Sequence, residues 1–345
     1  MLLCSVLLGC TPERDAESML ENYLWRLSNV LELDVPASTL STLTPLPRTR
    51  DRRLSVSAFE IGLLDFLSVQ GCSLGELVGY RNSSLGRVMP DSQRLVYEID
   101  FVDSVDRCVP RLDPQSDVEL IHQLSTVRDR KYAEIGIHFW NAIFAGPEFG
   151  QLFSASAALP NPDQVDQTPA ALAASQQLLA LLSHSDPRAA PALALDRAQL
   201  ESALAQLSAG GAGGQLRQRI AVLQDTLVRA TLMLNQATDA RAICPMQRPT
   251  ERGRTLRNVF DLFFAGDIQP YAVPIFNHGV LLLDALTALR ERGAVSPPPA
   301  MQGFWQQALG TDKSSEFGRF KRVWQGHIKA WQDALGACQL MPGQG

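Results

Sequence analysis

Residues 215–235 read QLRQRIAVLQDTLVRATLMLN, and their pattern decides the fold class of this chain. Apolar side chains return every three or four positions, which is the period of one face of an α-helix. The near-heptad spacing is typical of helices that pack as in a coiled coil. With an apolar pattern over 193–207 and a Gly-rich turn at 209–214, it predicts a projecting helical hairpin within about 168–240. The pattern is carried by Leu216, Ile220, Leu223, Leu227 and Leu234.

Helical spacing continues through most of the remaining chain. Thr168 and Pro169 are a favourable start for one helix, and Ser116 with Glu119 forms a capping-box pattern ahead of another. Few segments alternate as β-strands do, and no long unit repeats. We therefore predict an all-α, disulfide-stapled, multi-helix bundle with lobes at 10–160 and 161–345. Further helices are expected within 19–31, 59–67, 77–80, 95–105, 117–139, 256–263, 276–286 and 317–335, and a Pro- and Arg-bearing connection over 36–53.

Length and charge narrow the class of protein. A chain of 345 residues can bury a sizeable core without help from a metal. It carries 31 Lys plus Arg against 36 Asp plus Glu, a net charge of −5. General nucleic-acid binding needs a basic face that displaces counterions, so we expect no nucleic-acid partner.

The first ten residues, MLLCSVLLGC, resemble a bacterial lipobox. In that motif a small residue precedes a Cys that is lipidated and becomes the new N-terminus after cleavage. Residues 1–9 would then be the lipoprotein signal peptide and Cys10 the lipidation site, followed at once by a polar segment. Nine apolar residues are too few to span a bilayer. Thr11, rather than Asp, resembles an outer-membrane sorting signal, and the run lacks the basic residues that usually open a signal peptide.

Four cysteines remain after Cys4 and Cys10 are set aside, and an even number suits an oxidising periplasm. We favour disulfides Cys72–Cys108 and Cys244–Cys338, because each pair then closes a loop within one half of the chain. A disulfide that closes a loop of this length stabilises the folded protein by about 3–5 kcal/mol. Four buried free thiols are the alternative.

Gly71 to Gly75 reads GCSLG and matches G-x-S-x-G, the nucleophile elbow of serine hydrolases. That elbow needs a strand before it, whereas the preceding residues have helical spacing. Ser73 and Glu76 instead form a capping box, and Gly71 suits the end of a helix. We therefore predict no catalytic residue, and keep Ser73 only as the nucleophile of an alternative hydrolase.

Two basic segments are candidate contacts for an anion or a partner. Arg81 and Asn82 open a polar, Gly-containing loop whose amides could bind an anion. Arg252 and Arg254 belong to the most basic stretch, 241–257. Asp100, Asp103 and Asp106, and five scattered His, lack the spacing of a metal site, so we expect neither metal nor cofactor.

The lipobox ending at Cys10, the segment GCSLGELVGYRNSSLGRVMPDSQRLVYE at 71–98, and the tryptophan-bearing helix before Cys338 carry a resemblance. The chain resembles the proteobacterial lipoproteins grouped as domain-of-unknown-function family 3080. The resemblance implies a cell-envelope location and a helical fold, and it assigns no residue a role.

These observations predict a lipid-anchored protein that faces the periplasm from the outer membrane. It would act by binding or scaffolding, with the membrane and an envelope protein as its partners. The alternatives are an envelope hydrolase that uses Ser73, and a carrier that holds a lipid or another ligand between its helices.

Overall fold

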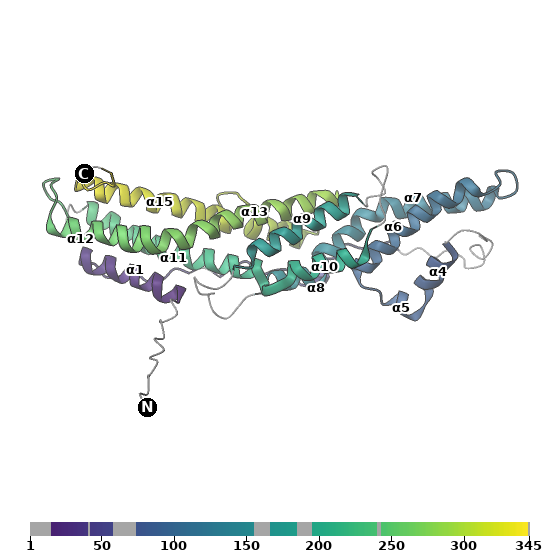
Figure 1. Ribbon diagram of the computed structural model, residues 1–345, viewed down its shortest axis with the longest axis horizontal. Coiled ribbons are helices and arrows are strands. Elements are labelled where there is room, and N and C mark those ends of the chain that lie inside the picture. Colours follow the sequence, from purple (N-terminus) through teal and green to yellow (C-terminus); the bar gives the residue numbers. More distant parts are fainter. Residues whose placement is uncertain are drawn as a thin grey trace, which may run out of the picture.

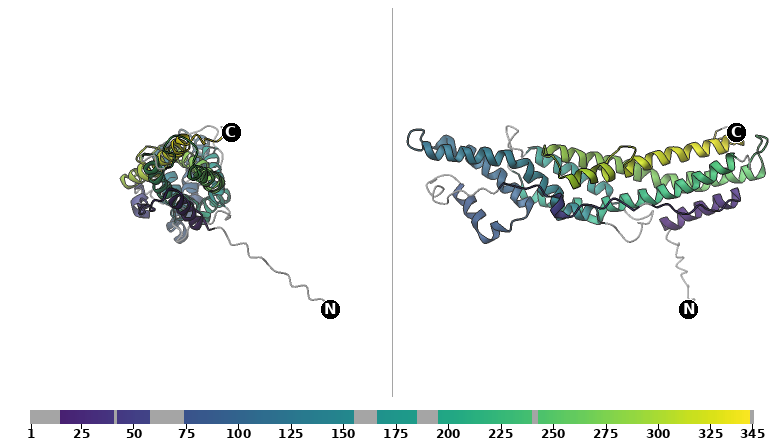
Figure 2. Two further views of the ribbon diagram at one scale, coloured as in Figure 1. Left: turned by 90° about the vertical axis from the view of Figure 1, so that its left-hand side faces the viewer. Right: turned by 180° about the vertical axis from the view of Figure 1, so that it is seen from behind.

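The computed structural model describes residues 15–40, 42–57, 74–154, 166–184, 195–239 and 243–343. These residues form an elongated, rod-like bundle of helices with no β-strand among them (Figures 1 and 2). The predicted all-α fold class is confirmed. The α-helices and the tight or wide helical turns, labelled η, are α1 (Ala16–Leu31), α2 (Thr49–Arg52), α4 (Leu74–Asn82), α5 (Ser84–Arg87), α6 (Asp91–Cys108), η1 (Val109–Arg111), α7 (Val118–Trp140), η2 (Asn141–Ala145), α8 (Pro147–Leu152), α9 (Thr168–His184), α10 (Arg197–Ser208), η3 (Ala209–Gly211), α11 (Ala212–Asp239), α12 (Glu251–Val259), η4 (Phe260–Ile268), α13 (Gln269–Gly293), α14 (Pro299–Phe304), η5 (Trp305–Leu309) and α15 (Glu316–Ala337).

The larger hydrophobic core runs along most of the rod and draws on both predicted lobes, 10–160 and 161–345. Their boundary stays a prediction. A smaller core joins α4, α6 and α7 at the end of the rod opposite α1 and α12 (Figure 1). Both cores form because helices with one apolar stripe can bury it only against one another.

The helices within 168–240 do not project from the body, which corrects that part of the prediction. α9 packs between α10 and α13, while α11 packs against α15 and α1. Gly210 and Gly211 adopt the left-handed conformation at the turn between α10 and α11, which glycine adopts without strain. Gly214 lies so close to the carbonyl of Ser154 that a Cβ would clash with it. The apolar faces of all three helices are therefore buried in the bundle.

Residues 251–293 form one continuous helix in place of the two predicted over 256–263 and 276–286. Pro274 lies inside this helix rather than before it. Pro lacks the amide that bonds the preceding turn, but Pro274 is exposed, so water can satisfy the carbonyl left unpaired. Among the described residues this is the one helix long and apolar enough to cross a membrane, and 39% of its apolar window is buried in the bundle.

The Pro- and Arg-bearing connection at 36–53 is an extended strap, pinned to the bundle by buried polar side chains. The Asp225 carboxylate accepts from the amide of Thr39 at 2.7 Å. The Glu316 carboxylate accepts from the amide of Thr44 at 2.9 Å. Because the strap has few helical bonds of its own, these side chains satisfy its backbone. It thereby runs from the end of α1 to α2, which packs against η2 and α14.

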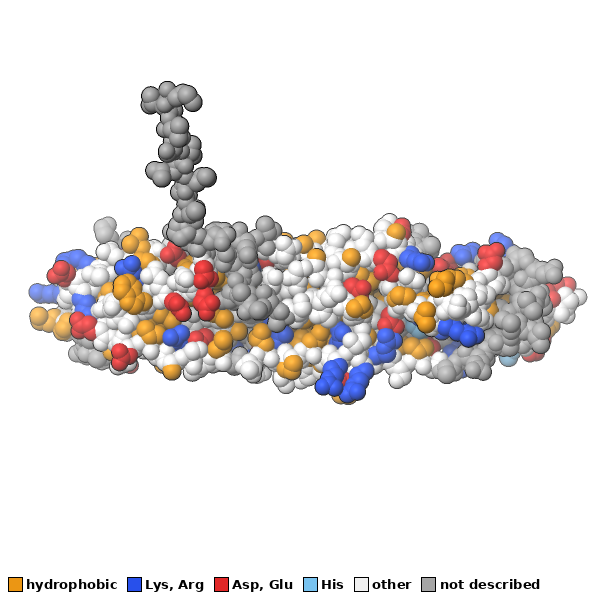
Figure 3. Space-filling view, turned by 90° about the horizontal axis from the view of Figure 1, so that it is seen from below, with side chains coloured by type: hydrophobic (Ala, Val, Ile, Leu, Met, Phe, Trp, Pro, Cys, Tyr) orange, Lys and Arg blue, Asp and Glu red, His pale blue; other side chains and the backbone are white. Residues whose placement is uncertain are grey.

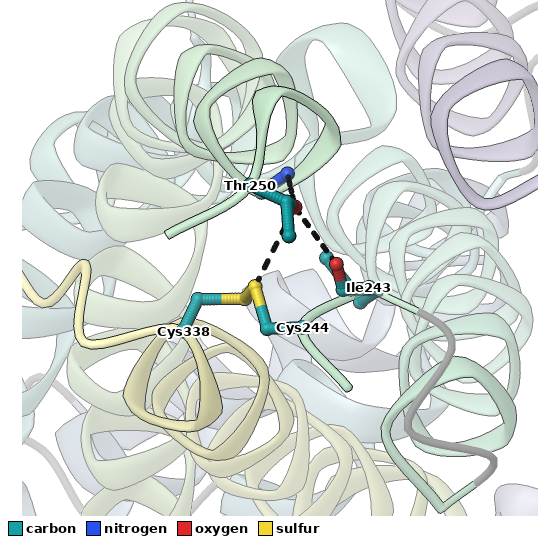
Figure 4. The surroundings of a disulfide bond; sticks show 5 residues. Ile243, Cys244, Thr250 and Cys338 are labelled. Atoms are coloured by element: carbon teal, nitrogen blue, oxygen red, sulfur yellow. Dashed lines mark hydrogen bonds between the residues drawn. A yellow bond between two sulfur atoms is a disulfide. The ribbon is translucent and has the colours of Figure 1, made fainter. Parts of the chain in front are cut away.

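The predicted disulfide Cys244–Cys338 is confirmed: it ties the segment before α12 to the end of α15, with 5.3 Å between the Cα atoms (Figure 4). The Thr250 hydroxyl lies 3.7 Å from Cys244 Sγ. It also donates to the carbonyl of Ile243 at 2.8 Å and accepts from the amide of Gly253, which caps α12. Cys72 lies outside the described residues, so its pairing with Cys108 stays a prediction.

Two further differences concern helix boundaries. α7 begins at Val118 after Asp117, which makes no side-chain cap, so the predicted Ser116 box does not form. The Asp117 carboxylate instead accepts from the amide of Asp113 at 2.9 Å. α14 and η5 occupy the region that follows Pro297, where no helix was predicted.

Candidate functional site

The predicted site residues fall in different places. Cys10 and Ser73 lie outside the described residues. Arg252 donates to the carbonyl of Val30 at 2.6 Å and pairs with Glu32 at 3.1 Å, so it holds α12 against α1. Arg254 is exposed on α12. Arg81 and Asn82, by contrast, line a groove of about 880 Å³ at the far end of the rod.

We call this depression the basic groove. Its walls come from α4, α5, α6, α7 and residues 53–57, which continue the chain from the strap. The apolar part of the lining includes Tyr97 and Phe101, which belong to the smaller core. The charged side chains that line the groove are Arg53, Arg81, Arg87, Asp91, Arg94, Glu98, Arg130, Lys131 and Glu134, so cations outnumber carboxylates.

Glu98 is the buried centre of the groove, with 1% of its surface exposed. One carboxylate oxygen lies 2.6 Å from Lys131 Nζ. Arg94 Nε approaches the other oxygen at 2.5 Å without the alignment of a hydrogen bond. Burial alone would raise the pKa of Glu98, but the charges of Lys131 and Arg94 outweigh it and lower that pKa. A charged Glu98 therefore holds two cations in fixed positions.

Aromatic rings support the same cations. Lys131 Nζ lies 4.8 Å from the ring centre of Phe101, and the Arg94 guanidinium lies 5.3 Å from that of Tyr97. Such contacts stabilise a cation where water is partly excluded. Burial raises the pKa of Tyr97 to about 12, so its hydroxyl stays protonated at neutral pH. Burial also lowers the pKa of His138, which leaves that imidazole neutral.

Residues 53–57 close one side of the groove. The Asn141 amide accepts from the amide of Leu54 and donates to its carbonyl, both at 2.9 Å. Both oxygens of Asp91 accept from the Arg53 guanidinium, one of them at 2.8 Å. These bonds fix the wall without helical structure.

Arg81 and Arg87 lie at the mouth. Arg81 donates to the carbonyl of Gly86 at 2.6 Å and so closes the loop between α4 and α5. Burial and the positive charges of Arg94 and Arg87 lower the pKa of Arg81. Arg87 is exposed. Two like charges that line the same groove favour an anion there.

The row of aspartates on α6 forms ion pairs. Asp103 pairs with Arg107 at 2.8 Å and Asp106 with Arg128 at 2.9 Å, as expected of a solvated face. Within the described ranges, no group of three or more His, Cys, Asp or Glu could hold a metal ion. A second depression, of about 680 Å³ between α13, α14 and η5, has Asp284, Glu291 and Asp312 in its lining and is not an apolar lipid cavity.

A buried polar network near the disulfide end is structural. Thr231 donates to the carbonyl of Leu227 at 2.6 Å, so it accepts from His327 Nδ1 at 2.9 Å. His327 Nε2 therefore accepts from the Tyr23 hydroxyl at 2.7 Å. Trp331 Nε1 donates to the Tyr23 hydroxyl at 2.9 Å and to His327 Nε2 at 3.1 Å. Tyr23 and His327 are fully buried, out of reach of a substrate.

Asp166 and His278 form a second pair that could suggest catalysis. Asp166 Oδ2 lies 2.7 Å from His278 Nδ1. Its other oxygen accepts from the amide and the hydroxyl of Thr168 at the start of α9, and lies 3.4 Å from Arg219. The carboxylate thus caps α9 and joins it to α11 and α13, which is a structural task.

Side chains of both signs are mixed on the face shown in Figure 3, where hydrophobic side chains are exposed singly or in small groups. The fold and the groove define an elongated all-α protein with a basic pocket at one end. The chain belongs to the family of proteins of unknown function DUF3080, whose model matches residues 20–342. No curated protein and no solved structure matches the chain.

Proposed function

We propose that this protein is a lipid-anchored binding protein of the cell envelope, facing the periplasm from the outer membrane. Its ligand carries an anionic group that docks in the basic groove. The observation that supports this most is the cluster of cations around Glu98 on a chain whose net charge is −5. The lipobox at Cys10 supports the anchor.

The groove suits a ligand with a phosphate or carboxylate group beside an apolar part. Arg guanidinium groups bind such oxyanions through paired N–H donors, and charge-assisted bonds are about twice as strong as neutral ones. Glu98, Lys131 and Arg94 hold one another, so the cations at the mouth, Arg81 and Arg87, are better placed to meet a ligand. Val56, Val78 and Met89 supply apolar lining beside them.

Titration calorimetry with phenyl phosphate and with inorganic phosphate tests the groove. We expect both probes to bind, phenyl phosphate more tightly, and Arg87→Glu combined with Arg81→Gln to weaken binding at least tenfold, about 1.4 kcal/mol. Arg254→Glu is the matched control, because it removes an exposed cation from α12. Binding that survives the groove variant but is lost with Arg254→Glu would place the contact on the basic stretch 241–257 instead.

Cys10→Ser tests the anchor. Each buried methylene of an acyl chain contributes about 0.8 kcal/mol, so several chains hold a protein on a membrane almost permanently. We expect the wild-type chain in the membrane fraction and a much larger share of the Cys10→Ser chain in the soluble periplasmic fraction. Globomycin should block processing of the wild type. Unchanged processing and fractionation in both experiments would remove the anchor from the proposal.

A further inference from the structure

The outward face of the long helix 251–293 carries no charge over more than five turns. Within 262–281, the buried positions alternate with an exposed row on the opposite side. Leu262 is 63% exposed, Val273 45% and Leu281 48%. We call this row the uncharged ridge; it consists of Leu262, Gly266, Pro270, Val273, Pro274, Asn277 and Leu281.

The ridge continues onto the neighbouring helix α1, which packs along α12 and η4. Trp25 is 54% exposed there. The guanidinium of Arg26 lies 4.8 Å from the Trp25 ring and 4.9 Å from the ring of Phe263. A Trp and an Arg beside apolar side chains are typical of surfaces at the headgroup level of a bilayer, because each combines an apolar body with a polar tip.

The start of α1 lies close to this surface. Asp15 caps α1, and α1 packs against η4, which leads directly into α13. Five peptide steps separate Cys10 from Asp15, a reach of roughly 17 Å at most. A lipid on Cys10 would therefore keep α1 and the beginning of α13 close to the bilayer.

We propose that the uncharged ridge and Trp25 rest on the lipid bilayer, with the basic groove at the other end of the rod. This inference rests on the anchoring part of the proposed function. The buried side of the same helix fills the main core, so the helix lies along the membrane surface instead of crossing it. Moving uncharged side chains from water to lipid requires little free energy, whereas charged side chains would have to lose their hydration at a large cost in free energy.

Sedimentation with neutral phosphatidylcholine vesicles tests the ridge without the lipid anchor or the attraction of charged lipids. The full chain with Cys10→Ser should partition onto the vesicles, and adding Leu262→Glu and Val273→Glu should lower its partition coefficient at least fivefold. The matched control adds Leu85→Glu and Val88→Glu, which are 73% and 76% exposed on and after α5. That control should leave the partition coefficient unchanged.

Equal partition of the ridge variant and the control, or no partition of the parent chain, would overturn the inference. Light scattering tests whether a second copy of the chain, rather than the bilayer, covers the ridge. A parent chain that is dimeric, and that the ridge substitutions make monomeric, would assign the ridge to self-association and overturn the bilayer proposal. Failure of the anchor appears separately, as unchanged fractionation of Cys10→Ser in cells.

Discussion

Replacing Glu316 by Ala should lower the free energy of unfolding by about 3–5 kcal/mol, because it leaves a buried guanidinium without its counter-ion. Glu316 and Arg217 are 8% and 9% exposed and share two bonds of 2.8 and 2.7 Å. The pair also accepts from the amide of Thr44 and donates to its carbonyl, which pins the strap to α11 and α15. Urea unfolding monitored by circular dichroism measures the change.

The matched control for this prediction is Asp333→Ala on the same helix. Asp333 pairs with Lys329 at 2.8 Å, but the two side chains are 49% and 72% exposed. Exposed pairs contribute at most about 1 kcal/mol. Replacing both buried partners with Arg217→Met and Glu316→Leu should cost less than Glu316→Ala alone, since no charge is left unpaired. Equal losses for Glu316→Ala and Asp333→Ala would contradict this account.

Acidification should destabilise the protein through His327. Burial lowers the pKa of this imidazole from 6.5 to about 3. Between these two values the unfolded chain binds the proton and the folded chain does not, so stability falls as the pH falls. The slope is about 1.4 kcal/mol per pH unit, or about 2–3 kcal/mol between pH 6.5 and 4.5. Unfolding in urea at several pH values measures it.

His327→Gln isolates this contribution, because the Gln carbonyl can accept from the Tyr23 hydroxyl but does not titrate. The variant should be less stable at neutral pH, since the bond to Thr231 is lost. Its free energy of unfolding should nevertheless fall less steeply with decreasing pH than that of the wild type. The two slopes should differ by about 1.4 kcal/mol per pH unit. His138 also lowers stability in acid, but it is present in both chains and cancels. Parallel pH profiles would show that His327 is not the group responsible.

Helical periodicity predicted most of the helices, because it depends on contacts only three or four residues apart. α11 and α15 lie close to the expected ranges. Trp331 lies in the tryptophan-bearing helix expected over 317–335, and it is buried in the core. The sequence did not predict that 251–293 is one helix. A Pro such as Pro274 usually marks the end of a helix, and the sequence does not show that this Pro lies on an exposed face.

The candidate site was predicted only in part. Arg81 and Asn82 were identified from a polar loop, but Arg53 and Lys131 come from segments far away in sequence. The one feature of the sequence that could have indicated the groove is the spacing of Arg94 and Glu98, four residues apart. Many helices carry such a pair on an exposed face, so the spacing alone does not predict a buried site. Arg252 was predicted as a possible contact for an anion or a partner, and in the structure it contacts the end of α1. The sequence did not predict this contact, because a run of basic residues does not show which of them pack inward.

The amino-acid sequence by itself determined the all-α class and the helical stripes, since these depend on local spacing and on which residue types are present. It only favoured the Cys244–Cys338 pairing, which the structure decided by bringing two residues 94 positions apart in the sequence to a Cα–Cα distance of 5.3 Å. Only the tertiary structure decided that the strap is pinned by Asp225 and Glu316, and that a basic groove forms at one end while an uncharged ridge lies beside α1. The physical reason is that a groove or a ridge is a relation between separate helices. Packing fixes it by choosing which face of each helix is buried.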